Sequence, residues 1–338
     1  MVEQKTIRES TIEFEREEEP KLNFFNKAFE WIKNNLKFLL IPGYVSEDLM
    51  ERQIQYEKTK SQRKFITRFK SMLTLIGITL MFIIISFAVF APWLSPYSRY
   101  YLTTPQYGSW EPPSPDHPLG TGDQGFDVLG RIIWGARTSL TVALPALFIA
   151  VSGGCVIGII ASYYGGWIDS VLMRIVDIML AFPSLVLVLF FIAIWGRRLE
   201  YFILAYGILG IAGYSRIIRG SVLQTKNLPY IDAARVSGAK NSRIMFRHIF
   251  PNVIQPIIVA FTFDIGGIIL SLAGLSFLGF ADTTLIEWGY DISTSRVQFY
   301  SAPWAAVWPG FMIMLTVLSF MLVGDGLRDA LDPRMKNL

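Results

Sequence analysis

The chain has 338 residues, of which 52% are hydrophobic and only 17% are charged, and its formal net charge is +4. A soluble domain of this length carries more charge and fewer apolar residues, so the composition indicates an integral membrane protein. The small net charge gives no indication of a nucleic-acid partner. Cys155 is the single cysteine, which excludes an intramolecular disulfide.

The first 71 residues are predicted to form a cytoplasmic tail. Residues 1–20 are polar and rich in acids, which is typical of a disordered segment and not of a cleavable signal peptide. Residues 24–40 place apolar side chains at helical spacing, with lysines on the other faces of the helix. These apolar residues are Phe25, Phe29, Ile32, Leu36 and Leu39. The pattern predicts an amphipathic helix that lies on the inner leaflet or packs on a partner protein.

Six apolar runs follow, each near the roughly 20 residues that a helix needs to cross the hydrocarbon of a bilayer. They cover about 72–91, 138–162, 170–195, 201–218, 253–280 and 305–324. Because lipid offers no hydrogen bonds to the backbone, and the runs are too long for barrel strands, the sequence predicts an all-α polytopic membrane protein with six transmembrane helices.

Charge sets the expected orientation in a cell membrane. Basic residues crowd just before the first span, and the positive-inside rule keeps such a cluster in the cytoplasm. They are Lys58, Lys60, Arg63, Lys64, Arg68 and Lys70. Counting spans from there puts both termini in the cytoplasm, including the C-terminal segment 325–338. The loop 92–137 is then extracytoplasmic, and the loop between the fourth and fifth spans is cytoplasmic.

The 226–251 loop, between the fourth and fifth spans, is basic and rich in small residues. A helix is expected over Pro229–Ser237, followed by a turn at Gly238 and a second helix that ends near Phe250. Ala233 and Ala234, like the glycine, have almost no side chain, so another protein can approach this backbone closely. The loop is therefore predicted to be a cytoplasmic docking element.

The loop also resembles a known family. Asp232-Ala233-Ala234-x-x-x-Gly238, with Pro251 thirteen residues beyond the glycine, is similar to the EAA loop of ABC importer permeases, with Asp in place of the usual Glu. "RHIFPN" at its end resembles the dipeptide and oligopeptide branch. Three more stretches resemble the C-type permease of that branch. They are "HPLGTGDQGFDVLGRIIWGARTSL" (117–140), "YYGGWIDSVLMRIVDIMLAFPSL" (163–185) and "VGDGLRDALDPRMKNL" (323–338).

The resemblance implies a type I ABC importer-like fold, with a permease core over 138–324, and a heterodimer with a B-type permease. It also implies two cytoplasmic ATPase subunits, which would bind ATP and Mg, and an extracytoplasmic solute-binding protein that delivers dipeptides, oligopeptides or oligosaccharides. The chain itself would bind no cofactor or metal and would not be an enzyme. The residues implied to couple to the ATPase are Asp232, Ala233, Ala234, Gly238, Arg243 and Pro251. Leu272 and Met321 stand where the family commonly has an acid and an Asn. These departures leave the identity of the transported solute undetermined.

Ionisable residues inside the expected spans are functional candidates because charge is costly in lipid. Arg174 and Asp177 are three residues apart on one helix, and we expect them to form a structural ion pair. Asp264 has no basic residue within a turn, so it must face a cavity, water or another chain. We assign it, with Ser271 and Ser276, to the candidate translocation path, while a hydrogen bond to a partner or a protonated carboxyl group stays possible on sequence alone.

A membrane enzyme and a secondary transporter are the two alternatives to an ATP-driven importer. A membrane enzyme would need a catalytic set, but the sequence holds no HExxH, no paired-cysteine motif and no GxxxxGK[ST], and "GLSF" (274–277) only half resembles an intramembrane serine protease motif. A proton-coupled secondary transporter could use Asp177 or Asp264. Such a carrier needs no docking element, so the 226–251 loop favours the ATP-driven importer.

Overall fold

A computed structural model describes residues 71–106, 108–280, 282 and 284–331, and all of them belong to one unit of the chain, Phe65–Leu338. Within these ranges the chain is helical and forms no strand. The predictions for the tail before residue 71, among them the amphipathic helix at 24–40, lie outside the described residues. So does the part of the C-terminal segment from 332 to 338.

Five helices are long and apolar enough to cross a membrane. They are α4 (Met72–Leu94), α5 (Val128–Tyr164), α8 (Leu199–Thr225), α11 (Phe250–Phe277) and α13 (Trp304–Leu331). Each contains one of the predicted apolar runs or most of it. The expected all-α polytopic fold is therefore confirmed.

The third predicted span, 170–195, is wrong as a single helix. The chain forms α6 (Gly166–Leu180) and α7 (Ser184–Trp195), which are bent by 84° at the break between them. Pro183 lies at that break, where it precedes α7. Proline has no backbone N–H and disfavours helical geometry in the residue before it, so α6 cannot continue through it. The spans number six if this bent pair counts as one.

Two of the spanning helices are longer than their apolar runs. α5 begins at Val128 and not near 138, because the buried Asp127 accepts a hydrogen bond from the Gly130 amide at 2.6 Å and caps the helix. A helix of 37 residues is about 55 Å long, well beyond the ~30 Å of hydrocarbon, so α5 extends outside the bilayer. α13 continues to Leu331, past the predicted end at 324.

Small residues bring α5 and α8 into close contact, and this is the most extensive helix pair in the unit. A Cβ atom added to Gly210 of α8 would lie only 2.6 Å from the Cβ of Ala150, and one added to Gly154 of α5 would collide with Tyr214. Close approach of this kind is how helices associate in lipid, where apolar burial gives no net gain. The contact places the backbone and the Cβ atom of Tyr214 directly against α5.

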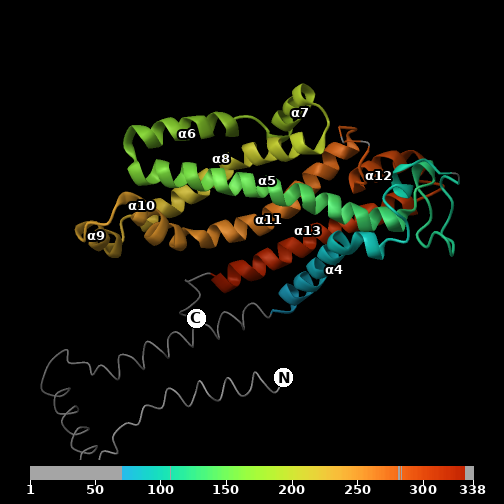
Figure 1. Ribbon diagram of the computed structural model, residues 1–338, viewed down its shortest axis with the longest axis horizontal. Helices are drawn as coiled ribbons and strands as arrows, with labels where there is room; N and C mark the ends of the chain where they lie inside the picture. The colour runs from blue at the N-terminus through green and yellow to red at the C-terminus, as the bar shows by residue number, and fades with distance from the viewer. Residues whose placement is uncertain (1–70, 107, 281, 283, 332–338) are drawn as a thin grey trace, which may run out of the picture. The chain divides into compact units, whose positions relative to one another are not determined.

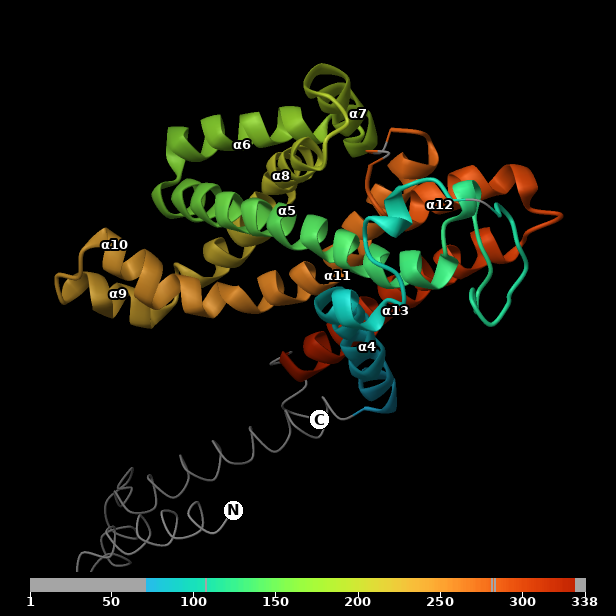
Figure 2. The ribbon, with the colours of Figure 1, turned by 45° about the vertical axis from the view of Figure 1, so that its right-hand side comes forward.

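The two ends of the helical unit carry different structures, as Figures 1 and 2 show. At one end lie the short helices α9 (Pro229–Val236) and α10 (Asn241–Arg243). At the opposite end lie α12 (Trp288–Ser295) and the segment 95–127, with the 3-10 turns η1 (Tyr101–Thr103) and η2 (Asp123–Gly125). We call this second end, residues 95–127 with α12 and its N-cap Glu287, the cap. A last 3-10 turn, η4 (Arg296–Gln298), follows α12.

Candidate functional site

The 226–251 loop begins with the predicted helix and turn. α9 ends at Val236, one residue before the predicted Ser237, and Gly238 follows in the left-handed region with φ +77°. The Ala239 amide donates to the Ala234 carbonyl at 3.1 Å, and the Gly238 amide donates to the Arg235 carbonyl at 3.0 Å. This pair of hydrogen bonds forms a Schellman motif at the end of α9. The motif requires a residue that tolerates positive φ, and glycine meets this requirement at position 238.

The second half of the loop joins the fifth span without interruption. α10 passes into the π-helix η3 (Ile244–Ile249) and then into α11, so that Asn241–Phe277 forms one continuous helix. Pro251 lies in the first turn of α11, and it does not break this helix. The sequence predicted a separate second helix ending near Phe250, and that boundary is wrong. A displacement of residues 241–249 would therefore reach α11 directly.

Three isoleucines and two polar contacts hold the loop on the rest of the unit. Ile231, Ile244 and Ile249 are fully buried in the main hydrophobic core. The Lys226 ammonium donates to the Ser162 carbonyl at 2.7 Å, and the Tyr163 hydroxyl donates to Asn241 Oδ1 at 2.8 Å. Ser162 and Tyr163 are at the end of α5, so this helix supports both halves of the loop.

Most of the other residues of the loop are exposed, although Met245 is buried and Ala234 and Ala239 are half-buried against the core. Val236 is 90% exposed and Phe246 is 65% exposed, although both are large apolar side chains. Asp232, Ala233 and Arg243 are exposed as well, and nothing lies within 4 Å of the space that a Cβ on Gly238 would occupy. Exposed apolar side chains beside basic residues are typical of a surface that binds another protein.

A cavity of about 420 Å³ lies between α5, α8, α11 and the bent pair α6–α7. Asp264 and Ser271, two helical turns apart on α11, both line it, together with Tyr206 and Tyr214 of α8. Ser276 does not join them. It is buried nearer the cap, where it lines a small pocket with Glu287. The structure thus brings two of the three candidate residues for the translocation path to one cavity.

The predicted ion pair between Arg174 and Asp177 is wrong. Asp177 instead bonds Arg216 of α8 at 2.6 Å. A second pair joins the same two helices, with Asp169 of α6 accepting two hydrogen bonds, of 2.7 and 2.6 Å, from Arg219 of α8. A partner on the neighbouring helix is available only once α6 packs against α8, so spacing along one helix could not identify it. The signal that could have identified these pairs is the presence of Arg216 inside the fourth apolar run and of Arg219 directly after it.

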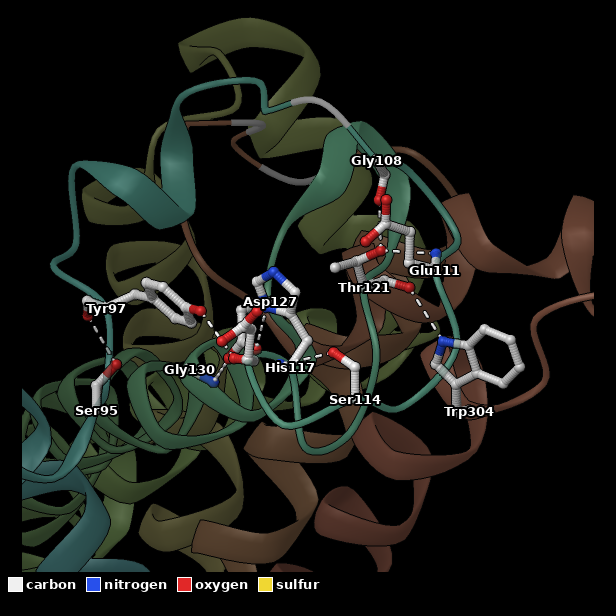
Figure 3. A network of polar contacts seen from close by, with 11 residues as sticks. Ser95, Tyr97, Gly108, Glu111, Ser114, His117, Thr121, Asp127, Gly130 and Trp304 are labelled. Atoms are coloured by element: carbon white, nitrogen blue, oxygen red, sulfur yellow. Dashed lines mark hydrogen bonds and ion pairs between the residues drawn. The ribbon is translucent and has the colours of Figure 1, made fainter.

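The cap holds a polar network that sequence reasoning did not assign (Figure 3). His117 faces the buried Asp127 at 2.9 Å, and the Trp304 indole donates to the Thr121 carbonyl at 3.1 Å. Beside this network, Arg131 of α5 donates to Asp291 of α12 at 2.7 Å, and both are buried. Arg131 also donates to the Leu102 carbonyl at 2.7 Å.

Burial raises the pKa of Asp291, and the nearby Arg131 opposes that shift. Burial likewise raises the pKa of Glu287, whose carboxylate caps α12 by accepting from the Tyr290 amide at 2.9 Å. Both groups contact only other residues of the cap or the ends of the helices. These contacts therefore indicate a structural role for the cap's charged groups.

Two family models match the chain. Residues 154–337, more than half of the chain, match the binding-protein-dependent transport system inner membrane component. Residues 63–113 match the N-terminal TM domain of oligopeptide transport permease C. The first match contains the 226–251 loop and the cavity residues of α8 and α11.

Characterised relatives cover most of the chain. The dipeptide transport system permease protein DppC of Alkalihalophilus pseudofirmus is 44% identical over 269 residues, which are 79% of this chain and 88% of that protein. The glutathione transport system permease protein GsiD of Pectobacterium atrosepticum is 39% identical over 75% of this chain and 85% of its own length. The GsiD protein of Escherichia coli O157:H7 is 38% identical over 81% and 89%.

A solved structure, an amino acid ABC transporter with histidines, aligns with a TM-score of 0.47 and 21% identity, over 59% of this chain and 94% of that chain. The assignment rests on the family match and on the identity to the relatives. The chain belongs to the family of binding-protein-dependent transport system inner membrane components, the membrane-spanning permeases of ABC importers.

Proposed function

We propose that this chain is the C-type permease of an ATP-driven importer of dipeptides or oligopeptides. It pairs with a B-type permease, with two ATPase subunits that bind ATP and Mg, and with an extracytoplasmic solute-binding protein. The names of the relatives, a dipeptide permease and glutathione permeases, support peptides over oligosaccharides as the solute. Membership of this family favours ATP as the energy source over the proton gradient of a secondary transporter.

The observation that carries this proposal is the continuous helix Asn241–Phe277. Its first turns belong to the exposed 226–251 loop, and its middle carries Asp264 into the cavity. An ATPase subunit seated on the loop would move one end of this helix when it closes on ATP. Because the helix is unbroken, that movement would displace Asp264 and Ser271 relative to α5 and α8.

The orientation follows from the same proposal. The 226–251 loop and both termini are cytoplasmic, and the cap lies outside, where the solute-binding protein docks. Single cysteines in place of the exposed Ser114 of the cap and the exposed Ser242 of the loop test this in a Cys155→Ala background. An impermeant thiol reagent should label Ser114→Cys in intact cells and should label Ser242→Cys only in inside-out vesicles. Labelling of Ser242→Cys in intact cells would contradict the orientation.

Bulky substitutions in the loop test the coupling role. Gly238→Arg and Ala233→Arg each place a large charged side chain where we expect the ATPase to approach. The glycine substitution also adds backbone strain of about 1–2 kcal/mol because φ is positive there. Ala233 lies inside α9, so its variant carries no such strain. Gly238→Asn is the matched control, since Asn tolerates this conformation better than other residues.

In the assembled complex, both arginine variants should leave ATP hydrolysis insensitive to the loaded solute-binding protein, while Gly238→Asn keeps most of the stimulation. All variants should reach the membrane in normal amounts. Normal peptide uptake by Ala233→Arg would contradict the docking role of the loop.

A further inference from the structure

We propose that the cavity on α11 binds the protonated amino group of the solute in transit, between the carboxylate of Asp264 and the hydroxyl of Tyr214. This rests on the proposed function, because the amino group considered is that of a peptide. The cavity then contributes to the choice of solute inside the membrane, separately from the solute-binding protein.

The size and lining of the cavity fit a small cationic group. Its volume of about 420 Å³ is within the range of small-molecule sites in proteins. Asp264 is the single acid of the lining, which includes no Lys, Arg or His. The polar groups beside it are the hydroxyls of Tyr206, Tyr214, Ser184 and Ser271. A cavity with this composition attracts a cation and repels an anion.

Tyr214 provides the second observation. The residue is only 2% exposed, and its hydroxyl lies beside the Asp264 carboxylate in the cavity lining, near enough to interact with it but without a hydrogen bond of standard geometry. Buried hydroxyl groups are normally well bonded, so a hydroxyl and a carboxylate that lie together without a well-formed bond are suited to share a third polar group between them. Gly154 of α5 lies against the Cβ atom and the backbone of Tyr214, so this close contact of α5 and α8 holds the base of the Tyr214 side chain in place.

Asp264 differs from the acids of the neighbouring spans. Asp169 and Asp177 of α6 are each paired with an arginine of α8 at 2.6 Å. Asp264 makes no ion pair within the described ranges, and its side chain is exposed to the cavity. An unpaired carboxylate at membrane depth is costly unless a cation visits it.

The chemistry of the two groups suits an ammonium ion. An ammonium group has three N–H donors and no acceptor, so it bonds the carboxylate and the oxygen of the tyrosine hydroxyl together. The free carboxylate end of a peptide would be repelled by Asp264. The rival occupant is a basic side chain of the partner permease, and the experiment below separates the two.

The first measurement tests the charge of the cavity in the assembled complex. Ser271→Cys, in a Cys155→Ala background, places a thiol on the cavity lining. Its rate of reaction with a cationic methanethiosulfonate is divided by its rate with an anionic one of similar size. Asp264→Asn should lower this ratio about tenfold, the size expected for losing one partly screened charge. The matched control is Asp325→Asn, which removes an exposed carboxylate of α13 that does not line the cavity.

The second measurement tests the amine. A dipeptide with a free amino group should slow the reaction of Ser271→Cys, and its N-acetylated form should not. Asp264→Asn and Tyr214→Phe should each raise the protecting concentration about tenfold, the scale of one lost charge-assisted hydrogen bond, and Asp264→Glu should restore part of the protection.

An unchanged ratio in Asp264→Asn would overturn the proposal, because the carboxylate would then be neutral or already paired with a cation of the partner. Equal protection by both peptides would overturn the role of the amine. Peptide uptake by the unmodified complex, driven by ATP, is measured in parallel. Its absence would reject the proposed function, and the ratio would then decide on the cation site by itself.

Discussion

The cap and the 226–251 loop, at opposite ends of the helical unit, treat their charged residues in opposite ways. In the cap, Asp127, Arg131 and Asp291 are buried and bonded to one another or to the ends of helices. In the loop, Asp232 and Arg235 are exposed and form a single ion pair at 3.1 Å. A region that buries charge must satisfy it internally, whereas a region that exposes charge and apolar side chains together can leave them for a partner. The cap therefore pairs most of its buried charge within itself, with only Asp291 Oδ2 among the acidic oxygens of this pair left without a hydrogen bond, whereas the loop leaves charged and apolar side chains exposed together.

The largest effect should come from breaking the cap's buried pair with Arg131→Met. The variant leaves Asp291 buried without its cation and the Leu102 carbonyl without a donor. Removing one partner of a buried pair costs about 3–5 kcal/mol. We expect the free energy of unfolding to fall by that amount when the purified protein is titrated with denaturing detergent.

The double variant Arg131→Met with Asp291→Leu separates the pair from general damage to the cap. It removes both charges, so it should recover most of the lost stability. A single variant as stable as the parent protein would show that the pair does not stabilise the cap.

A smaller effect, dependent on pH, should come from Glu287→Gln. Burial raises the pKa of Glu287 in the folded protein, so the stability tied to its proton is fully present below the pKa of the unfolded chain, about 4.3. That stability is lost as the pH rises through the higher folded pKa. Glutamine keeps an oxygen for the Tyr290 amide and does not titrate.

The melting temperature of Glu287→Gln should therefore exceed that of the parent protein above neutral pH, and the two should converge near pH 4. If the melting temperatures of the two proteins changed in parallel with pH, the ionisation of Glu287 would not destabilise the folded protein, and the prediction would be wrong.

The sequence predicts the spans and the helix-turn of the loop because local signals determine them. Pro229 begins α9 and Gly238 ends it, and apolar runs locate α4, α5, α8, α11 and α13. The bend at Pro183 also has a local cause, but the length of the apolar run alone predicts a single span there. For these elements, periodicity and the proline and glycine positions suffice.

The contacts between helices could not be predicted in this way. The pairing of Asp177 with Arg216, and the grouping of Asp264 with Tyr214, depend on how α6, α8 and α11 pack. A sequence indicates that Asp264 needs a polar neighbour, but the identity of that neighbour is set by helix rotation. The cap network has the same origin, since Arg131 and Asp291 are 160 residues apart in the chain.

The smallest effect on stability should come from the loop, and this makes Arg235→Gln the sharpest test of the comparison. Its pair with Asp232 is exposed, and such pairs contribute less than about 1 kcal/mol. Arg198→Gln at another exposed pair, with Glu200 at 3.2 Å, is the matched control. Neither variant should shift the melting temperature measurably. In the assembled complex, however, Arg235→Gln alone should speed the dissociation of the ATPase subunits, measured by surface plasmon resonance at low salt. A clear loss of stability in Arg235→Gln, or equal dissociation rates in the two variants, would show that the loop, like the cap, uses its charges for its own structure.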